Sequence, residues 1–568
     1  MQNIVTLGLQ ERMQGMKTLP GSRRLTSATV LTSLIALVVV AASNASATQE
    51  RAIASVSAVS TDIDISGPFL QHLTKNPHSA KAAQRCGEPE IAQDALHPSI
   101  LVMDCMSSEL NYETPMSNPL WALSKVTNAS EWRQWCYTFI SRDGGNTWRP
   151  VNPQPLMSGG IINSCADPLA EAGPSGELYL AEDAGIMVAD NAKGPMTAHG
   201  PLTINVGGSP WASDGLRFTR SLDGGKTWSA LSRIPTAIDR PFWTVDESTG
   251  DLYEVSGCIG YASVVYALTR MGAYGCTSES RNLAVSSDQG RRWDPLVGVT
   301  NQTLPTTALA PGRLHNINAD GGASVIAAAR GVFATAGNGG FDTKPTDVGV
   351  FKFSVNNGAT FTERPIPLGN AGPCPSPVIS GLAADPAGSR TFALIVLCAP
   401  NSEVVRVFVT HDLGTNWTET ADLAAPPPSG YVTTADDARS SSALSDLSTV
   451  VSRVATPYSV NRPWVAYGPT GALGVIWRQN YGAVPGGEFG HAGGPQDVFV
   501  AISNDGGAKF TAPIRVNTAA SPAADPRQIY GDDTSEIMVG RHYAYAVWGD
   551  WRSGELETWF RKVPIPGH

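Results

Sequence analysis

Ionisable side chains recur at one kind of position in this sequence, beside a proline that opens a short apolar run. Such segments begin at Glu88-Pro89, Asp167-Pro168, Arg240-Pro241 and Arg462-Pro463. Carboxyl groups can transfer protons, and guanidinium groups bind anions with two parallel donors. These residues could therefore perform general acid–base or electrostatic catalysis if the fold brings them together.

Seven residues at or near these positions form the candidate site: Asp167, Asp239, Glu88 and Tyr530 as catalytic groups, and Arg240, Arg462 and Asp532 as substrate-binding groups. We expect Asp167 and Asp239 to transfer protons and the two arginines to hold an anionic ligand. For each residue alone, the alternative is a hydrogen bond or ion pair at the start of a strand. A proline fixes its own φ and favours an extended residue before it, so these segments predict strand starts.

The elements that would position these residues are predicted by a repeated turn. The pattern Ser/Thr-x-Asp/Asn-x-Gly-x-x-Trp/Phe occurs six times, with copies that begin at residues 141, 221, 286, 354, 410 and 503. The acidic or amide side chain accepts bonds from the following backbone N–H groups, glycine supplies a positive φ, and the aromatic ring anchors the turn. Such a turn at long, regular spacing predicts a β-propeller with one copy in each blade.

The eight-residue pattern resembles the Asp box, or BNR repeat, of the sialidase superfamily, and its copies cover most of the chain after residue 85. The resemblance implies an all-β propeller of four-stranded blades. In that superfamily the boxes lie in turns at the rim of the blades, so the resemblance implies a structural role for them.

A second repeat predicts the number of blades. Seven units each contain a short strand, a turn and a second, often aromatic strand, and six of these units are followed by one eight-residue turn. The seventh unit has only three visible strands, and residues 61–70 are expected to supply the fourth. We therefore predict seven blades, with the six blades of true sialidases as the alternative.

The resemblance also implies a catalytic apparatus, but the sequence departs from it. Sialidases hold a carboxylate with three arginines and use an aspartate acid–base and a tyrosine nucleophile activated by a glutamate. Their Arg-Ile-Pro motif lies on the first strand, whereas Arg233-Ile234-Pro235 follows the second eight-residue turn, where an outer strand is expected. The first strand opens with Glu88-Pro89-Glu90 instead, so no catalytic residue is transferred from the family.

The chain more closely resembles secreted bacterial sialidase-like propellers that close with Trp-x-Asp-x-Arg. This motif is Trp548-Gly549-Asp550-Trp551-Arg552 here, and Asp550 and Arg552 are expected to pair and close the final blade.

Residues 1–47 are predicted to be a signal peptide. Arg23-Arg24 precede an apolar run at 28–42, and Ala45-Ser46-Ala47 has the small-residue form that signal peptidase cleaves. An uncleaved single-span anchor is the alternative, although the run is short for that role. We expect a secreted or periplasmic protein, with residues 48–85 as an N-terminal segment and 86–568 as the propeller.

The eight cysteines agree with an oxidising compartment. Pairing of nearest neighbours predicts four disulfides: Cys86–Cys105, Cys136–Cys165, Cys258–Cys276 and Cys374–Cys398. Spacing alone leaves other connectivities open.

The charge of the chain limits its partners. Without the predicted leader the sequence holds 36 basic and 49 acidic residues. An acidic surface argues against nucleic acid or an anionic membrane. The sequence contains no phosphate-binding loop, HExxH, CxxC or GxSxG motif, so we expect no cofactor and no metal. The expected partner is a glycan, and the expected state is a monomer.

Two functional hypotheses follow. The first is a secreted sialidase-like glycoside hydrolase that acts at chain ends of glycans, α-sialosides included. The second is a non-catalytic propeller that binds a glycan or a protein at the mouth of its channel.

Overall fold

The fold is described from a computed structural model. It describes residues 61–70, 84–110, 132–151, 164–187, 193–197, 200–203, 211–230, 232–234, 242–256, 282–295, 325–338, 348–368, 377–388, 390–398, 402–426, 458–481, 495–522 and 534–567. No helix in these ranges is long and apolar enough to cross a membrane. The predicted signal peptide and three of the predicted disulfide cysteines, Cys258, Cys276 and Cys374, lie outside them.

The described strands form seven antiparallel sheets of four strands. From the innermost strand outward, blade 1 contains β2 (Gln84–Gln93), β3 (Leu101–Leu110), β4 (Trp132–Ser141) and β5 (Arg149–Val151); blade 2 contains β6 (Ser164–Ala172), β7 (Leu178–Met187), β10 (Trp211–Ser221) and β11 (Ser232–Ile234); blade 3 contains β12 (Phe242–Val245), β13 (Leu252–Ser256), β14 (Asn282–Ser286) and β15 (Asp294–Pro295); blade 4 contains β16 (Val325–Ala329), β17 (Val332–Asn338), β18 (Val348–Ser354) and β19 (Thr362–Pro367).

The remaining blades follow the same order. Blade 5 contains β20 (Pro377–Ala384), β21 (Phe392–Cys398), β22 (Val405–Thr410) and β23 (Thr418–Leu423); blade 6 contains β24 (Tyr458–Tyr467), β25 (Leu473–Tyr481), β26 (Gln496–Ser503) and β27 (Ile514–Arg515); blade 7 contains β28 (Ser535–Val539), β29 (Tyr543–Asp550), β30 (Glu557–Pro564) and, outermost, β1 (Ile63–Asp64). A short helix, α2 (Gly67–Leu70), follows β1, and a hairpin of β8 (Lys193–Thr197) and β9 (Gly200–Thr203) lies between β7 and β10 in sequence.

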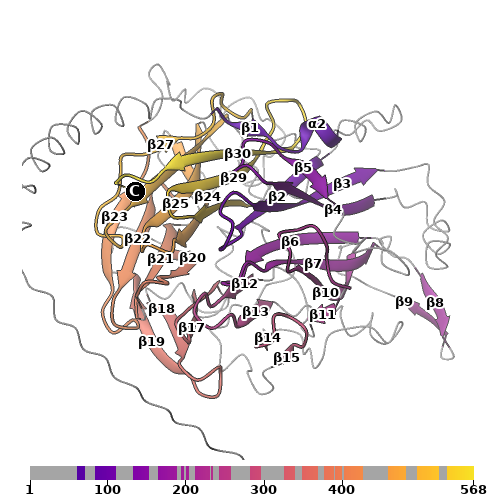
Figure 1. The fold of residues 1–568 in the computed structure, drawn as a ribbon, viewed down its shortest axis with the longest axis horizontal. Helices are drawn as coiled ribbons and strands as arrows, with labels where there is room; N and C mark the ends of the chain where they lie inside the picture. Colours follow the sequence, from indigo (N-terminus) through magenta and orange to yellow (C-terminus); the bar gives the residue numbers. More distant parts are fainter. Residues whose placement is uncertain are drawn as a thin grey trace, which may run out of the picture. The chain divides into compact units, whose positions relative to one another are not determined.

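The blades are arranged in a ring around a central channel. Each innermost strand contacts the innermost strand of the next blade, from β2 through β6, β12, β16, β20 and β24 to β28, and β28 contacts β2 (Figure 1). The predicted seven-bladed, all-β propeller is confirmed, and the six-bladed alternative is wrong.

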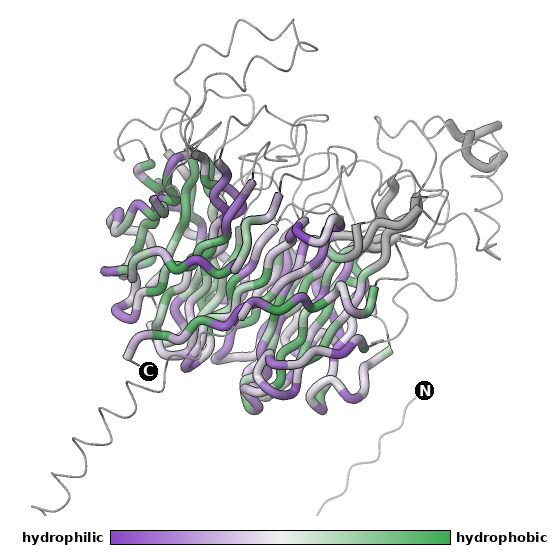
Figure 2. The backbone as a smooth tube through the Cα atoms, turned by 90° about the horizontal axis from the view of Figure 1, so that it is seen from above, coloured by the Kyte–Doolittle hydropathy of each residue, from purple (hydrophilic) through white to green (hydrophobic). Residues whose placement is uncertain are grey.

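Apolar side chains hold the blades together. The described residues contain seven buried apolar clusters, one at each junction between neighbouring blades. Inner strands such as β21 and β22 are buried almost along their whole length, because both of their faces pack on other blades, whereas the outer strand β19 is largely exposed. Figure 2 shows hydrophobic residues along the strands and hydrophilic residues concentrated at the turns. Burial of these apolar faces supplies the main driving force for folding.

The N-terminal strand closes the ring. Strand β1 pairs with β30 in antiparallel register, with Ile63 opposite Phe560 and Asp64 opposite Trp559. The prediction that residues 61–70 supply the fourth strand of the last blade is confirmed.

The closing motif stabilises this junction. Arg552 donates from Nη1 to Asp62 at 2.6 Å and from Nη2 to Asp550 at 2.6 Å, and its guanidinium lies 4.0 Å from the centre of the Trp559 ring. The side chains of Asp62 and Asp550 are only 3% and 0% exposed. The predicted pair of Asp550 and Arg552 is present, and it also binds the strand that closes the ring.

All six eight-residue turns join the third and fourth strands of a blade, as predicted. In the second copy, Ser221 Oγ accepts the N–H of Gly225 at 2.8 Å, and Asp223 Oδ1 accepts the N–H groups of Lys226 and Thr227 at 3.0 and 2.9 Å. The hydroxyl and N–H of Thr227 lower the pKa of Asp223 to about 2.

The turns also connect neighbouring blades. Arg364 Nη1 of blade 4 donates to the carbonyl of Asp412 in the turn of blade 5 at 2.7 Å, and Lys562 of blade 7 donates to Asn146 Oδ1 in the turn of blade 1 at 2.8 Å. Through these contacts the turns help to hold neighbouring blades together. Arg233 and Ile234 of the Arg-Ile-Pro segment lie on β11, the outermost strand of blade 2, as expected.

Of the predicted disulfides, Cys86–Cys105 is confirmed and links β2 to β3. Cys136 and Cys398 are also disulfide-bonded. The pairs predicted for them remain predictions, because Cys374 and the side chain of Cys165 lie outside the description.

Candidate functional site

Three predicted site residues lie at one structural position in three blades. Glu88 on β2, Asp167 on β6 and Arg462 on β24 each precede a proline, and each lies where the pairing with the second strand slips. These slips are β-bulges, which bend a strand and redirect its side chains. The residues are the fourth or fifth of their strands, so the predicted strand starts are wrong, because each strand begins earlier and continues through the bulge. We call the part of the channel beside the first residues of these strands its amino end.

The backbone at these bulges differs from the prediction. The sequence predicted extended residues before the prolines, but Glu88, Asp167 and Arg462 have φ values of 50°, 44° and 46°. A positive φ costs a residue with a side chain about 1–3 kcal/mol. The prediction is wrong because the bulge of a paired strand, rather than the local preference of an X-Pro dipeptide, sets the conformation. Such strain is concentrated at functional sites in many proteins.

The other predicted site residues, Asp239, Arg240, Tyr530 and Asp532, lie outside the described residues, so their roles remain predictions. Glu88 and Arg462 are buried, with 8% and 2% of their surface exposed.

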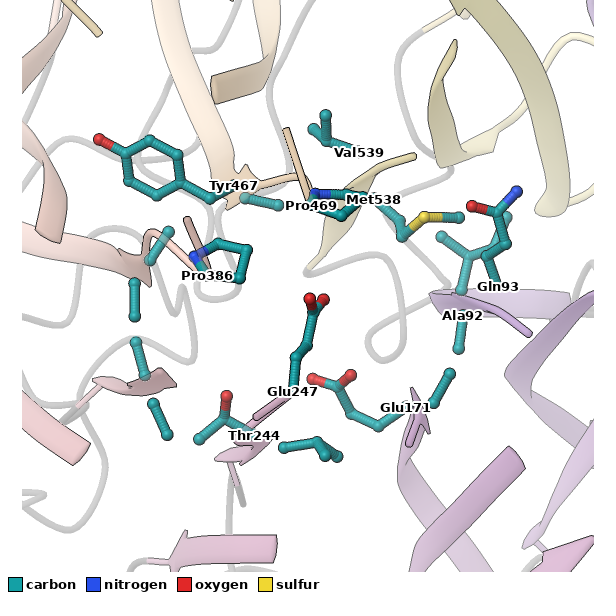
Figure 3. Close-up of a pocket in the computed structure, with 18 of the residues that line it drawn as sticks. Ala92, Gln93, Glu171, Thr244, Glu247, Pro386, Tyr467, Pro469, Met538 and Val539 are labelled. Atoms are coloured by element: carbon teal, nitrogen blue, oxygen red, sulfur yellow. The ribbon is translucent and has the colours of Figure 1, made fainter. Parts of the chain in front are cut away.

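A cavity of about 460 Å³ occupies the channel below the bulges. The innermost strands of all seven blades line it, and it extends to the turns that join the first and second strands, which we call the turn end. The acidic residues Glu90, Glu171, Glu247 and Glu536 line this cavity. Figure 3 shows the carboxyl groups of Glu171 and Glu247 pointing into it, with the Glu171 carboxyl beside the side chain of Glu247.

Glu90 and Asp167 form the junction between the bulges and this cavity. Burial raises the pKa of Glu90 well above its ordinary value, and the negative charges of Glu171, Asp104 and Asp167 raise it further, against a backbone hydrogen bond from Ala170. Glu90 therefore releases its proton at a higher pH than an exposed glutamate does, and Asp167 lies close enough for its charge to contribute to this shift. Blades 1 and 2 thus bring two carboxyl groups near each other, and that of Glu90 has a raised pKa.

Asp104 and Glu182 continue the acidic cluster behind the channel wall. Asp104 on β3 is directly opposite Glu90 and completely buried. Its Oδ1 accepts bonds from the Thr138 hydroxyl at 3.1 Å and the Cys105 N–H at 3.2 Å. Burial raises the pKa of Asp104 to about 7, although these two bonds oppose the change. Burial, and then the charge of Asp104, also raise the pKa of Glu182 on β7.

The cluster extends across the cavity to blades 3 and 7. Burial, followed by the charge of Glu247, raises the pKa of Glu171 to about 8. Burial and the charge of Glu90 raise the pKa of Glu536, although Glu536 accepts the N–H of Ile91 across the junction of blades 7 and 1. Glu247 is exposed to the cavity, but the protein around its carboxyl group still excludes enough water to raise its pKa. The positive charge of Arg541 opposes this effect.

This arrangement is suited to proton transfer. Carboxyl groups that remain protonated at neutral pH next to an ionised one can act as general acid and general base. Within the described ranges, no group of three or more His, Cys, Asp or Glu side chains is arranged to hold a metal ion.

Sequence analysis missed Asp104, Glu171, Glu182, Glu247 and Glu536 as site residues. A signal was present for some of them, since Glu171 and Glu536 each lie on a short strand whose neighbours are mostly apolar. A carboxyl group in such a strand is costly to bury, so it indicates a special environment. Asp104 and Glu182 lie on second strands, and their link to the channel required the pairing register.

No protein-family model matches the sequence, and no curated protein is similar to it. Solved structures do match. A protein of unknown function from Dyadobacter fermentans is 11% identical, over 89% of this chain and 98% of that chain, with a TM-score of 0.38.

Two further matches are enzymes. The phage phi92 endosialidase is 12% identical over 89% of this chain and 69% of that chain, with a TM-score of 0.39. A Hadza microbial sialidase is 15% identical over 77% and 73%, with a TM-score of 0.35.

Proposed function

We propose that this propeller is a glycoside hydrolase whose reaction takes place at the junction of blades 1 and 2. The observation that carries the proposal is the pair of Glu90 and Asp167 at the channel wall, where burial, and after it the negative charges of Glu171, Asp104 and Asp167, raise the pKa of Glu90. Cleavage of a glycosidic bond needs one protonated carboxyl to donate to the leaving oxygen. It also needs one carboxylate to activate water or to attack the sugar.

In this proposal Glu90 protonates the leaving oxygen and Asp167 is the base or nucleophile. The strained bulge holds Asp167 in one conformation, which would limit the reorganisation needed in the transition state. Glu88, at the matching bulge of blade 1, is a further group that could contact the sugar. The other carboxyls of the channel would keep Glu90 protonated by their charge.

The charge of the channel favours some substrates over others. Arg541 is the one cationic residue among the described residues that line the cavity, against four glutamates. We therefore propose a neutral or amino sugar as the preferred substrate over an α-sialoside, whose carboxylate needs a cluster of arginines.

Hydrolysis of a panel of chromogenic glycosides, an α-sialoside included, tests the proposal. Glu90→Gln and Asp167→Asn should each lower kcat by about 10²- to 10⁴-fold. Asn tolerates a positive φ, so Asp167→Asn should fold. Asp294→Asn, an exposed change on outer strand β15, is the matched control and should leave kcat unchanged.

A pH profile distinguishes chemistry from structure. Since the charge of Asp167 raises the pKa of Glu90, Asp167→Asn should move the Glu90 limb of any residual activity to lower pH. No turnover of any glycoside by folded wild-type protein would refute the hydrolase and favour the second hypothesis, a non-catalytic propeller that binds a glycan or a protein, here one with cationic groups. That hypothesis has the acidic cavity in its support.

A further inference from the structure

The cavity in the channel has two chemically different sides. Its four glutamates come from four consecutive blades of the ring, one each from blades 7, 1, 2 and 3. Blades 4 and 5 contribute only alanine, isoleucine, leucine and proline side chains, at 326–328, 382–384 and 386. Of the described residues that line the cavity, none in blades 4, 5 or 6 is charged. An acidic side and an apolar side therefore face each other across one space.

Two aromatic rings meet across the channel at this cavity. Phe242 begins β12 of blade 3 and Trp464 lies on β24 of blade 6, and these blades are not neighbours in the ring. Their ring centres are nevertheless 5.8 Å apart, and the ring planes are 14° from parallel. Both residues line the cavity. The stacked pair therefore spans the channel and adds an aromatic surface to the cavity wall.

Solvent reaches this space at the turn end. Glu247 lies in the turn that follows β12 and is exposed, and Figure 3 shows its carboxyl group inside the cavity. Pro386 and Pro469, in the matching turns of blades 5 and 6, line the same end. Proline fixes its backbone torsion, so this part of the wall is formed before a ligand binds. The cavity volume of about 460 Å³ is within the range of about 300–1,000 Å³ that is usual for small-molecule sites.

The carboxyl groups of Glu171 and Glu247 lie side by side on the acidic side of the cavity. Within the described ranges, neither has a lysine, arginine or histidine side chain at hydrogen-bonding distance, although the charge of Arg541 acts on Glu247. Burial and then the negative charge of Glu247 raise the pKa of Glu171 to about 8. A cation between two such carboxyl groups would replace their repulsion with attraction to both.

We propose that this cavity binds an amino sugar with a free ammonium group, which lies between Glu171 and Glu247 while a C–H face of the sugar ring packs on the apolar side. An ammonium group donates charge-assisted hydrogen bonds to carboxylates, and C–H groups pack on apolar and aromatic surfaces. An N-acetylated or neutral sugar lacks the cation, so it would leave the two carboxyl groups without a charged partner. The sugar therefore matches both sides of the cavity.

The inference rests on the proposed function and deepens it, because it selects an amino sugar over a neutral one. Glu171 connects the two sites. Its charge is the largest charge effect on Glu90, so the ammonium group would lie next to the proposed acid. The reactive bond and the cationic group of the substrate would then be held by neighbouring carboxyl groups of blades 1, 2 and 3.

Three chromogenic substrates that differ only at C2 test the proposal: a glucosaminide, the N-acetylglucosaminide and the glucoside, each as the α and the β anomer. They are compared at pH 7, where most of the amino group is protonated. The kcat/KM for one anomer of the glucosaminide should be at least about tenfold that for the other two sugars, because hydrogen bonds between charged groups are the stronger ones.

Glu247→Gln removes one charge from an exposed side chain of nearly the same shape, so the variant should fold. The ratio of kcat/KM for the glucosaminide to kcat/KM for the glucoside should fall at least about tenfold. A ratio is used because any general effect on the acidity of Glu90 cancels in it. Asp294→Asn, which removes an exposed charge on outer strand β15, is the matched control and should keep the wild-type ratio. A wild-type ratio near one, or the same ratio in Glu247→Gln, would overturn the inference.

These outcomes are separate from the test of the hydrolase. If wild type cleaves the glucoside as well as the glucosaminide, the hydrolase stands and the amino-sugar inference is refuted. If it cleaves no glycoside, calorimetric titration with methyl glucosaminide and methyl glucoside decides. Binding of the amino sugar at least about tenfold more tightly, with the difference lost in Glu247→Gln, would refute the hydrolase and support the ammonium site. Binding of neither sugar would overturn both.

Discussion

The buried carboxyl group of Asp104 should make the stability of the propeller depend on pH in an unusual direction. Its pKa is about 7 in the folded protein, against an ordinary value of 3.8. Between these values the folded state holds a proton that the unfolded state has lost, so the free energy of unfolding falls as pH rises. The stabilising effect is complete below pH 3.8 and is lost as the pH passes about 7.

The size of the effect follows from the same pKa. Between about pH 5 and pH 7 each pH unit changes the free energy of unfolding by about 1.4 kcal/mol for one proton. Asp104 alone should therefore make the wild-type protein about 2–3 kcal/mol less stable at pH 8 than at pH 5. Glu90, Glu171, Glu182 and Glu536 have raised pKa values as well, so their contributions have the same sign.

Asp104→Asn removes the titrating group while preserving its contacts. The Asn Oδ1 can still accept from Thr138 and the N–H of Cys105. The variant should match wild type near pH 5 and exceed its stability by about 2–3 kcal/mol near pH 8. Because Glu90 and Glu182 both experience the charge of Asp104, their pKa values should also move toward ordinary values in the variant.

Urea unfolding followed by tryptophan fluorescence at constant ionic strength, from pH 5 to pH 8, measures this difference. Asp294→Asn serves as the control and should keep the wild-type pH slope. A wild-type protein that is equally stable at both ends, or an Asp104→Asn variant with an unchanged slope, would refute the assignment of a protonated Asp104.

Two further changes test the ring itself. Arg552→Ala should lower the free energy of unfolding by about 3–5 kcal/mol, because it leaves Asp62 and Asp550 buried without their cation. Although burial opposes it, bonds from Thr518 and Arg552 lower the pKa of Asp62, so this stability is present above pH 3.8 and is lost as the pH falls further. Urea midpoints at pH 7 and pH 3 should show both effects. Arg552→Lys should retain part of the stability. An Arg552→Ala midpoint equal to that of wild type would contradict the ring-closing role of Arg552. Ser221→Ala should cost about 1–3 kcal/mol in the same assay, since the buried Gly225 N–H loses its acceptor, and an unchanged midpoint would show that the eight-residue turn is held by other bonds.

The ring could be predicted from the sequence because its signals are local. The Ser, Asp and Gly of each eight-residue turn bind one another within a few residues, so their chemistry is visible in a short pattern. The count of seven blades required one further step, the missing fourth strand of the last unit. The signal for that step was also local, because residues 61–66 alternate between polar and apolar as a strand does.

The site could be predicted only in part, because its geometry depends on long-range pairing. The prediction that X-Pro positions occupy equivalent places in different blades holds for Glu88, Asp167 and Arg462, which all lie at a bulge of an innermost strand. Their left-handed backbone is imposed by the bulge in each strand pair, and no dipeptide rule contains that information. The partners that make Glu90 a proton donor come from residues between 14 and 81 positions away, and only the ring brings them together.

The acidic cluster and the closure of the ring meet at the same junction. Blade 7 joins blade 1 in the channel through Glu536, which accepts the N–H of Ile91, and at the rim through β1 and Arg552. Carboxyl groups so close to one another weaken the centre of this junction whenever they ionise. The buried ion pairs at the rim and the apolar cluster between them, which includes Phe560, do not depend on those protons. A propeller built in this way can hold a strained, proton-rich channel because the elements that close the ring lie away from it.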